Sequence, residues 1–378
     1  MNCLLLLMSF LCFFITSLVY ATPVNLRDKI GQMLIIGFEG SVVDIHSPIV
    51  KAIQKDNIGG VVLFDYNPKT AHFDKNIINT SQVRKLTHDL QQMNHDAQMN
   101  HHRELLPLII SVDDEGGDRA TRLSPTHGFP QTLSAKEVGH LGDHMANKNA
   151  DLMANNLSDA GFNLNFSPVL DVNVNPDNPI IGALGRSFSA NPNEVTHYAK
   201  IYSKHFLNHN IQCAYKHFPG HGSATADSHL GFVDVSKTWR PKELQPYVYL
   251  LNRKTSCGMV MTAHLVNRQL DASGLPATLS HKIITQVLRK KMKFQGVVIT
   301  DDMQMKAITN SYSLEESVTL AINAGADMLL FGNQLTDAPQ DIDALVHLIE
   351  QKVRTNDISE QRINEAYEHI VRFKNTLQ

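Results

Sequence analysis

The chain has 378 residues, of which 43% are hydrophobic and 19% charged, and its formal net charge is −3. A chain of this length and composition can bury a sizeable core and is typical of a globular protein. The acidic balance and the single Trp give no basic, aromatic surface for nucleic acid. We therefore expect a globular protein that does not bind nucleic acid.

The first 21 residues differ from the rest of the chain. The stretch from Leu4 to Val19 is almost wholly apolar, and Ala21 then offers a small residue for cleavage before Thr22. This pattern predicts a secretory signal peptide over residues 1–21. The alternative is an uncleaved anchor, but the apolar run is short for a bilayer span. We expect a periplasmic or secreted protein without a stable membrane anchor after cleavage.

Eight short, continuously apolar runs follow, and each ends in polar or glycine residues. Continuous apolarity is typical of parallel strands that are covered on both faces. The predicted strands cover residues 33–38, 60–64, 106–113, 164–171, 213–217, 259–264, 296–301 and 327–332.

Helical patterns lie between these runs. Cap signals or apolar stripes begin near Ser81, Asn191, Ser280, Ser313 and Ser359. Eight strands that alternate with helices predict an α/β fold, a single-domain (β/α)8 TIM barrel over residues 22–378. No second domain is predicted after the eighth strand.

Ionisable residues gather where the predicted strands end. In a TIM barrel these ends form the face on which catalytic residues lie. An acid that ends a strand can also simply cap the next turn, and this alternative is strongest for Asp171. The residues at the strand ends are Asp113, Asp171, Lys216, His217, His264 and Asp301.

The segment from Lys216 to His229 is the most informative stretch. It reads Lys-His-Phe-Pro-Gly-His-Gly, then four residues, then Asp227-Ser228-His229. Its prolines and glycines break regular structure, so the fifth strand should pass into a loop that carries an acid beside an imidazole. Asp227 can orient His229 as a proton donor, and Asp301 at the seventh strand end can act as a nucleophile.

A nucleophilic carboxylate and a proton donor are the two groups that a retaining glycosidase needs. Charged side chains at the same face could bind sugar hydroxyls. The candidates are Asp113, Arg186, Lys216 and His217.

The motif from Lys216 to His229 resembles the signature of family 3 glycoside hydrolases of the β-N-acetylglucosaminidase branch. Further matching segments occur in the order of that family, over roughly residues 25–375. They are 59–64, 112–117, 166–171, 185–188, 261–264 and 300–303.

The resemblance implies a β-N-acetylhexosaminidase of the single-domain type. In it Asp301 matches the nucleophile, His229 the general acid/base and Asp227 its dyad partner. Arg122 joins the substrate-binding residues Asp113, Arg186, Lys216 and His217. The implied partner is a glycan containing N-acetylglucosamine, from cell-wall muropeptides or chitin, with no metal or organic cofactor. We expect a monomer.

Three other functions remain open at this point. The same site could serve a β-glucosidase or an N-acetylglucosaminide phosphorylase. A metal-dependent barrel hydrolase could use His217, His221, His229 and Asp301, although a His-x-His pair after the first strand is missing. A catalytically silent sugar-binding protein is the third alternative.

Two cysteines remain after the predicted cleavage, Cys213 and Cys257, and each opens an apolar run. A disulfide is conceivable if their strands are neighbours in an oxidising compartment. Two buried free thiols are the alternative.

Overall fold

The computed structural model describes residues 24–251, 253–336 and 338–377. The predicted signal peptide, residues 1–21, lies outside these residues. Within them, no helix is long and apolar enough to cross a membrane.

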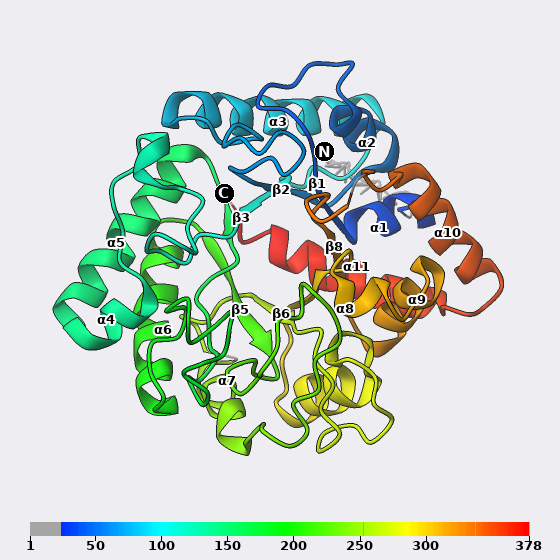
Figure 1. The fold of residues 1–378 in the computed structure, drawn as a ribbon. Helices are drawn as coiled ribbons and strands as arrows, with labels where there is room; N and C mark the ends of the chain where they lie inside the picture. The colour runs from blue at the N-terminus through cyan, green and yellow to red at the C-terminus, as the bar shows by residue number, and fades with distance from the viewer. Residues whose placement is uncertain (1–23, 252, 337, 378) are drawn as a thin grey trace, which may run out of the picture.

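Eight parallel strands close into a barrel in sequence order, with β8 pairing to β1. Helices surround this barrel on the outside (Figure 1). The predicted (β/α)8 TIM barrel is therefore confirmed. The strands are β1 (Leu34–Gly37), β2 (Gly60–Leu63), β3 (Ile109–Val112), β4 (Leu164–Asn165), β5 (Gln212–Phe218), β6 (Met259–Thr262), β7 (Val297–Asp302) and β8 (Met328–Phe331).

β3 and β4 are much shorter than predicted. The segment before β3 leaves the ladder because side-chain amides replace strand neighbours: Gln98 accepts from the Leu106 amide and Gln91 from the Leu108 amide. β4 has only two regular residues, and Pro168 just beyond it has no amide hydrogen to donate. The chain meets β5 again only at a bridge between Val169 and Lys216.

The predicted helix caps are confirmed at Asn191, Ser313 and Ser359, whose side chains accept backbone amides. α3 is capped two residues earlier than the Ser81 signal suggested, by Asn79. The helices are α1 (Leu26–Gln32), α2 (Pro48–Asp56), α3 (Thr80–Asn100), α4 (Ala135–Leu141), α5 (Asp143–Ala160), α6 (Pro192–Asn208), α7 (Gln245–Leu250), α8 (Lys306–Thr309), α9 (Leu314–Ala324), α10 (Ile342–Arg354) and α11 (Glu360–Lys374), with short turns η1 (Pro125–His127), η2 (Pro241–Leu244) and η3 (Ala277–Leu279) and a π-helix, η4 (Lys282–Lys291).

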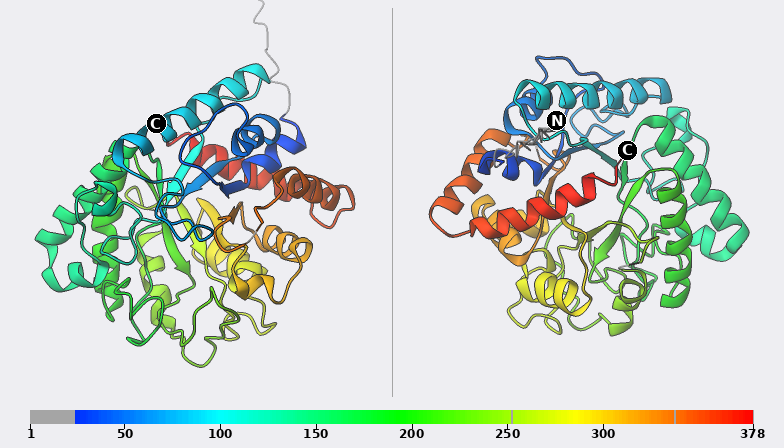
Figure 2. Two further views of the ribbon diagram at one scale, coloured as in Figure 1. Left: turned by 45° about the horizontal axis from the view of Figure 1, so that its top comes forward. Right: turned by 180° about the vertical axis from the view of Figure 1, so that it is seen from behind.

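Helix α11 lies across the N-terminal end of the barrel, as the view from behind shows (Figure 2). Asp327, which directly precedes β8, is fully buried and pairs with Arg289, with Arg362 at 2.5 Å and with His369 at 2.9 Å. Arg362 and His369 belong to α11, so this ion cluster attaches the helix to the barrel. Access to the barrel interior is therefore from the opposite end.

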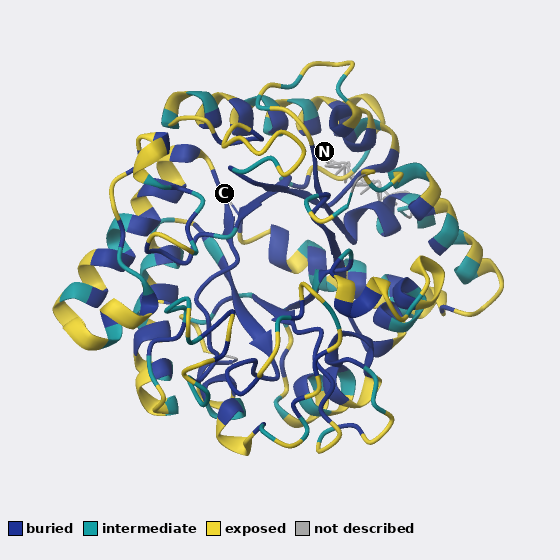
Figure 3. Ribbon diagram, in the orientation of Figure 1, coloured by how far each residue is buried: buried dark blue, intermediate teal, exposed yellow. Residues whose placement is uncertain are grey.

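The strands are buried and the outer surfaces of the helices are exposed, so the core lies inside the barrel and between barrel and helices (Figure 3). Cys213 on β5 and Cys257, which precedes β6, are joined in a disulfide with a Cα–Cα distance of 4.7 Å. The disulfide alternative, rather than the free thiols, is the one that the structure contains. It links two neighbouring strands at the end opposite to the loop of residues 219–229.

Candidate active site

A pocket of about 280 Å³ lies at the C-terminal ends of the strands. Seven of the eight predicted site residues line it, and the eighth, Asp227, is bonded to one of the seven. The sequence-based prediction of the site is thus matched by one continuous cavity. The seven are Asp113, Arg122, Arg186, Lys216, His217, His229 and Asp301.

Asp301 is the second-last residue of β7, and its carboxylate faces the pocket. Its Oδ1 accepts the Asp302 amide at 2.8 Å. Burial raises the pKa of Asp301, but the imidazoles of His264, His217 and His229 outweigh that effect, and the net pKa is lowered. Asp301 is therefore held as a carboxylate, the form that can act as a nucleophile.

His229 and Asp227 form the predicted dyad on the loop after β5. His229 Nδ1 lies 2.7 Å from Asp227 Oδ1, which also accepts the His229 amide at 2.8 Å. A carboxylate on Nδ1 places the hydrogen there and leaves Nε2 as the nitrogen that exchanges a proton with a substrate. The His229 side chain is 46% exposed, so it is reachable from solvent as well as from the pocket.

The loop that carries the dyad is attached through Ser228, which is buried between half-buried Asp227 and exposed His229. Ser228 Oγ lies 3.2 Å from His221 Nε2, and its carbonyl accepts the Ala307 amide at 3.3 Å. Burial lowers the pKa of His221 to about 4, so this imidazole is neutral near pH 7. The His229 loop is thus attached both to the turn after β5 and to the segment after β7.

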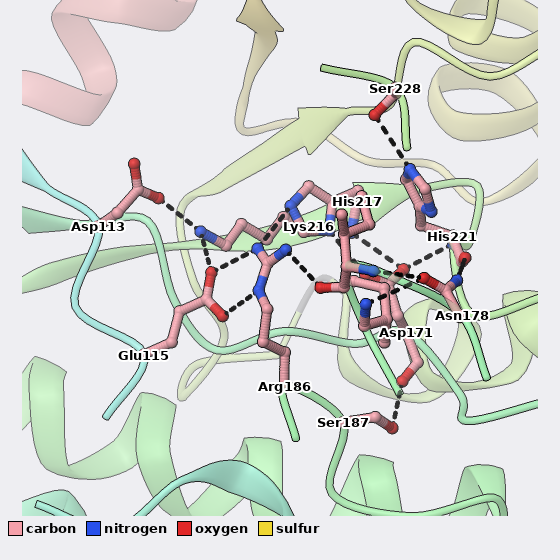
Figure 4. A network of polar contacts seen from close by, with 12 residues as sticks. Asp113, Glu115, Asp171, Asn178, Arg186, Ser187, Lys216, His217, His221 and Ser228 are labelled. Carbon is pink, nitrogen blue, oxygen red and sulfur yellow. Dashed lines mark hydrogen bonds and ion pairs between the residues drawn. The ribbon is translucent and has the colours of Figure 1, made fainter. Parts of the chain in front are cut away.

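Glu115 organises the cations of the pocket (Figure 4). Its two oxygens accept from Arg186 Nε and Nη2, each at 2.7 Å, and Oε1 lies 2.7 Å from Lys216 Nζ. Lys216 also donates to Asp113 at 2.6 Å. Burial raises the pKa of Glu115, but Arg186 and Lys216 outweigh it and hold this pKa well below its usual range.

The pKa values of the cations shift in the opposite direction to that of Glu115. Burial lowers the pKa of Lys216, yet the carboxylates of Asp113 and Glu115 outweigh it and the pKa is raised. Arg186, Lys216, Glu115 and Asp113 therefore form an ionised set of two cations and two anions. Asp113 is the more exposed of the two acids, at 31% against 7%. It is the carboxylate with free oxygen surface for a sugar hydroxyl.

Asp171 does more than cap a turn, which was the strongest alternative for this residue. It is fully buried, and its oxygens accept from His217 Nδ1 at 2.6 Å and from the His221 amide at 2.7 Å. His217 Nε2 then lies 3.3 Å from Arg186 Nη2, an obligate donor. These partners assign the hydrogen of His217 to Nδ1 and make Nε2 an acceptor. Asp171 therefore fixes both the orientation and the tautomer of His217.

Arg122 reaches the pocket from the loop after β3. Its Nη1 lies 3.3 Å from Asp65 Oδ1, and its guanidinium lies 5.8 Å from the Phe64 ring. Arg119 lines the pocket as well. Arg122 thus lines the pocket, and Asp65 from the loop after β2 positions it.

Three buried groups next to the site were not assigned a role from the sequence. Glu115 was visible only as one of three consecutive acids, and its pairing with two cations depends on chain segments about 70 and 100 residues away. Asp302 lies beside Asp301, accepts the Gln304 and Gly332 amides, and has its pKa raised to about 6 by burial. His264 Nε2 donates to the Asp302 carbonyl at 2.9 Å, and its Nδ1 lies 2.8 Å from Thr278 Oγ1.

The histidines that a metal-dependent hydrolase would need have other partners. His217 contacts Asp171 and Arg186, His221 contacts Ser228, and His229 contacts Asp227. Across the described parts of the chain, no three His, Cys, Asp or Glu side chains are arranged to hold a metal ion. The donor arrangement therefore gives the metal alternative no support.

Known proteins are similar to this chain in sequence and in structure. A relative named beta-hexosaminidase A, from Pseudoalteromonas piscicida, is 30% identical over 401 residues; the alignment covers 96% of this chain and 64% of the relative. The beta-hexosaminidase of Haemophilus influenzae is 28% identical over 87% of this chain and 89% of its own length.

Among solved structures, a glycoside hydrolase family 3 beta-N-acetylglucosaminidase from Paenibacillus sp. str. FPU-7 superposes with a TM-score of 0.82. It is 31% identical, over 93% of this chain and 62% of its own length. The chain thus spans less than two thirds of two of these relatives. The family model described as the glycosyl hydrolase family 3 N terminal domain matches residues 25–373. The chain belongs to glycosyl hydrolase family 3.

Proposed function

We propose that the chain is a retaining exo-β-N-acetylglucosaminidase that releases terminal, non-reducing β-linked N-acetylglucosamine. The observation that carries the proposal is that Asp301 and the Asp227–His229 dyad share one sugar-sized pocket. The names of the related proteins support the hexosamine specificity. The pocket ends on buried strand side chains, among them Met261 and Leu330, which favours removal of a terminal sugar.

The reaction proceeds by two displacements at the anomeric carbon. Asp301 attacks that carbon and forms a glycosyl ester, while the glycosidic C–O bond breaks and His229 gives its Nε2 proton to the departing oxygen. His229 then takes a proton from water, which attacks the same carbon and releases the ester. Two inversions give net retention. Asp227 stabilises the imidazolium that exists before the first step and after the second.

The ionised set around Glu115 binds the sugar rather than taking part in bond breaking. Asp113, Lys216 and His217 present charged or polar atoms to the pocket, and Glu115 and Asp171 hold them in place. Charge-assisted hydrogen bonds of this kind are short and directional. They fix the ring with its anomeric carbon toward Asp301.

Paired aryl glycosides test this proposal. The wild-type chain should hydrolyse 4-nitrophenyl N-acetylglucosaminide much faster than the matching glucoside; the reverse preference would make it a β-glucosidase. Asp301→Ala should abolish hydrolysis of every N-acetylglucosaminide and prevent covalent trapping by a fluorinated sugar. Glu365→Gln, at a half-exposed pair on α11, is the control that should leave rates unchanged.

His229→Ala separates the acid from the nucleophile. The variant should lose about 10²–10⁴ in rate on an unactivated glycoside. A 2,4-dinitrophenyl glycoside, whose leaving group needs no proton, should suffer far less in glycosylation. Equal losses on both substrates would argue against His229 as the acid. Absence of hydrolysis of any glycoside by the wild-type chain would favour the silent sugar-binding alternative.

Phosphorolysis is the second candidate function. The acid/base is an imidazole, which is neutral after donating its proton and does not repel a phosphate dianion as a carboxylate would. Product analysis in phosphate buffer decides between water and phosphate. N-acetylglucosamine 1-phosphate would identify a phosphorylase, and free N-acetylglucosamine alone would identify a hydrolase.

We further propose that the chain acts in the periplasm or outside the cell, as a monomer, on peptidoglycan fragments or chitin-derived oligosaccharides. The apolar N-terminal stretch and the Cys213–Cys257 disulfide support an oxidising compartment. Cell fractionation with N-terminal sequencing of the mature protein tests cleavage after Ala21. Light scattering tests the oligomeric state.

A further inference from the structure

The turn of residues 219–223, directly after β5, connects the floor of the pocket to the loop that carries the acid/base. In this turn the His221 amide donates to Asp171 at 2.7 Å, and His221 Nε2 lies 3.2 Å from Ser228 Oγ (Figure 4). Ser228 directly precedes His229 in the chain. The position of the turn therefore helps to determine where the His229 imidazole lies.

Glu243, a residue of η2, packs against this turn at Gly220. It is fully buried, and a Cβ on Gly220 would lie 2.8 Å from the Glu243 Cβ and 3.2 Å from its Oε2. Gly220 has a φ of +115°, so glycine both adopts the conformation of the turn and lets Glu243 approach its backbone. Beside Glu243, Trp239 Nε1 donates to the Pro219 carbonyl at 3.1 Å. Glu243 and Trp239 thus contact the start of the turn.

The carboxyl group of Glu243 has one hydrogen-bonded oxygen and one free oxygen. Oε1 accepts the Arg240 amide at 3.0 Å, as a glutamate in the first turn of a helix often does. Oε2 is buried and has no hydrogen-bond partner in the described chain, and the same is true of the Ser223 hydroxyl in the turn. Ser223 is nevertheless one of the neighbours that shift the Glu243 pKa. A proton on Oε2 would give this oxygen a hydrogen to donate to an acceptor such as Ser223 Oγ.

The charge of this carboxyl group changes near neutral pH. Burial raises the pKa of Glu243, its contacts with the Arg240 amide and with Ser223 lower it, and the carboxylate of Asp171 raises it, so that the net pKa is about 7. A buried carboxylate that has only an amide and a hydroxyl beside it is unstable, which is why the neutral acid persists to this pH.

The other titratable groups around Glu243 keep their charge in this range. Burial lowers the pKa of His221 to about 4, and burial, Asp171 and Glu243 raise the pKa of Tyr247 on α7. For Asp171, burial is outweighed by two neighbouring imidazoles, and the pKa is lowered. The Arg240 guanidinium is exposed and donates to two backbone carbonyls nearby rather than to Glu243. Of these groups, Glu243 alone changes its charge near pH 7.

We propose that Glu243 is a positioning residue of the reaction, whose neutral carboxyl group keeps the turn of residues 219–223, and through His221 and Ser228 the acid His229, in the productive position. Ionisation places a second buried negative charge near Asp171, and the turn moves to relieve it. The inference rests on the proposed function, in which His229 protonates the leaving group. It adds a residue that does not line the pocket.

Glu243→Gln tests the proposal, because glutamine keeps the shape, can still accept the Arg240 amide and stays neutral at every pH. Two N-acetylglucosaminides serve as substrates, one with an unactivated alkyl leaving group and the 2,4-dinitrophenyl glycoside, whose leaving group needs no proton. The readout is kcat/KM, which reports the first displacement for both substrates. Glu316→Gln is the matched control, since Glu316 accepts the Ser313 amide at 2.9 Å in the same kind of cap on the surface helix α9.

We expect the wild type and Glu243→Gln to be similar at about pH 6 and to differ at about pH 8, where about nine tenths of a group with a pKa of about 7 is ionised. A misplaced acid costs about tenfold, so the variant should then be about fivefold faster than the wild type on the alkyl glycoside. The two chains should be equal on the dinitrophenyl glycoside at both pH values. Loss of the His229 proton affects both chains alike and cancels in this comparison.

Trp239 gives a readout that does not depend on activity. It is the single Trp of the chain, and its Nε1 would lie 3.5 Å from a Cβ on Gly220, next to the Glu243 carboxyl group. The apolar side chains around it do not titrate. Its fluorescence in the wild type should therefore change with a midpoint near pH 7, and in Glu243→Gln it should not. The wild-type titration tests the proposal even if the variant does not fold.

Four results would overturn the proposal. They are identical pH profiles for the wild type and Glu243→Gln, an equal change on both substrates, a slower variant at about pH 6, and a Trp239 fluorescence that is constant through neutral pH. An equal change would mean that Glu243 supports the pocket as a whole, and a slower variant that the carboxylate is the productive form. A wild type that hydrolyses neither glycoside refutes the proposed function itself, whereas hydrolysis with identical pH profiles refutes the role of Glu243 alone.

Discussion

Glu115→Gln should lower the stability of the protein through the buried ion pairs of the pocket. The substitution keeps the shape of the side chain and removes its charge. Arg186 keeps one neutral amide oxygen as an acceptor, but the new amide NH2 cannot accept from its other N–H group; the Ile180 carbonyl remains at 2.9 Å. Lys216 loses the charge of one partner and keeps Asp113 at 2.6 Å. The variant therefore leaves a buried guanidinium without a counter-charge in contact.

The expected loss in the free energy of unfolding follows from the ion pairs that remain in the variant. Removing one partner of a buried ion pair typically costs about 3–5 kcal/mol, and the surviving Lys216–Asp113 pair places this case near the lower limit, about 3 kcal/mol. A domain of about 350 residues unfolds with an entropy of about 0.7 kcal/mol/K near its Tm. A loss of about 3 kcal/mol therefore lowers the Tm by about 4 °C.

Chemical denaturation followed by circular dichroism measures the free energy of unfolding, and steady-state kinetics measure KM on the same samples. We expect KM to rise because Arg186 and Lys216 are no longer held in place. Glu365→Gln is the control, since Glu365 pairs with Arg362 at 3.0 Å but is 48% exposed and should cost under about 1 kcal/mol. If Glu115→Gln is no more destabilising than this control and leaves KM unchanged, the reasoning about a buried ionised set is wrong.

Three further predictions concern other parts of the molecule. Lys374 is fully buried, its Nζ has no hydrogen-bond partner among the described residues, and burial lowers its pKa to about 7. Between pH 7 and about 10.5 the unfolded chain therefore binds more protons than the folded chain, so the free energy of unfolding should rise with pH in this window. At pH 9, Lys374→Met should be more stable than the parent by about 2 kcal/mol. A stability difference that does not depend on pH would contradict this prediction. The Cys213–Cys257 disulfide spans 44 residues, so replacing both cysteines by alanine should lower the free energy of unfolding by about 4 kcal/mol, as measured by denaturant titration. Loss of activity without loss of stability would point to a different role for the disulfide. Ser228→Ala removes the contact to His221 that helps to hold the His229 loop. The kcat on unactivated glycosides should therefore fall about tenfold, as expected for a partly misplaced acid, and the kcat on dinitrophenyl glycosides should fall less. An equal fall in kcat on both kinds of substrate would show that Ser228 does not act through His229.

The barrel and most of its site could be predicted because the signals are local. Each parallel strand is a short apolar run, and the residue that ends the run lies at the catalytic face by the geometry of the fold. Asp301, Lys216 and His217 were found in this way, and the Asp227–His229 pair is local because its members are two residues apart. The same local logic left two roles open for Asp171, because acids that end strands often serve only the next turn.

The pairing of Glu115 could not be predicted, because it depends on residues distant in the chain. Gln91 and Gln98 shorten β3 only once α3 has packed against it. The shortness of β4 has a local cause, Pro168, which lies in the same apolar run. Whether the two cysteines were bonded also depended on the distance between them, which the sequence left open.

The sequence was enough to determine an eight-stranded barrel with a nucleophile and a proton donor at one end. The signals were the order of the apolar runs, the helix caps and the spacing of the catalytic motif. They suffice because hydrophobic burial and hydrogen-bond satisfaction act on each segment separately. Which charges pair inside the pocket was decided only by the tertiary structure. A buried carboxylate is stable only with its cations in contact, and here those cations arrive on β5 and on the loop after β4.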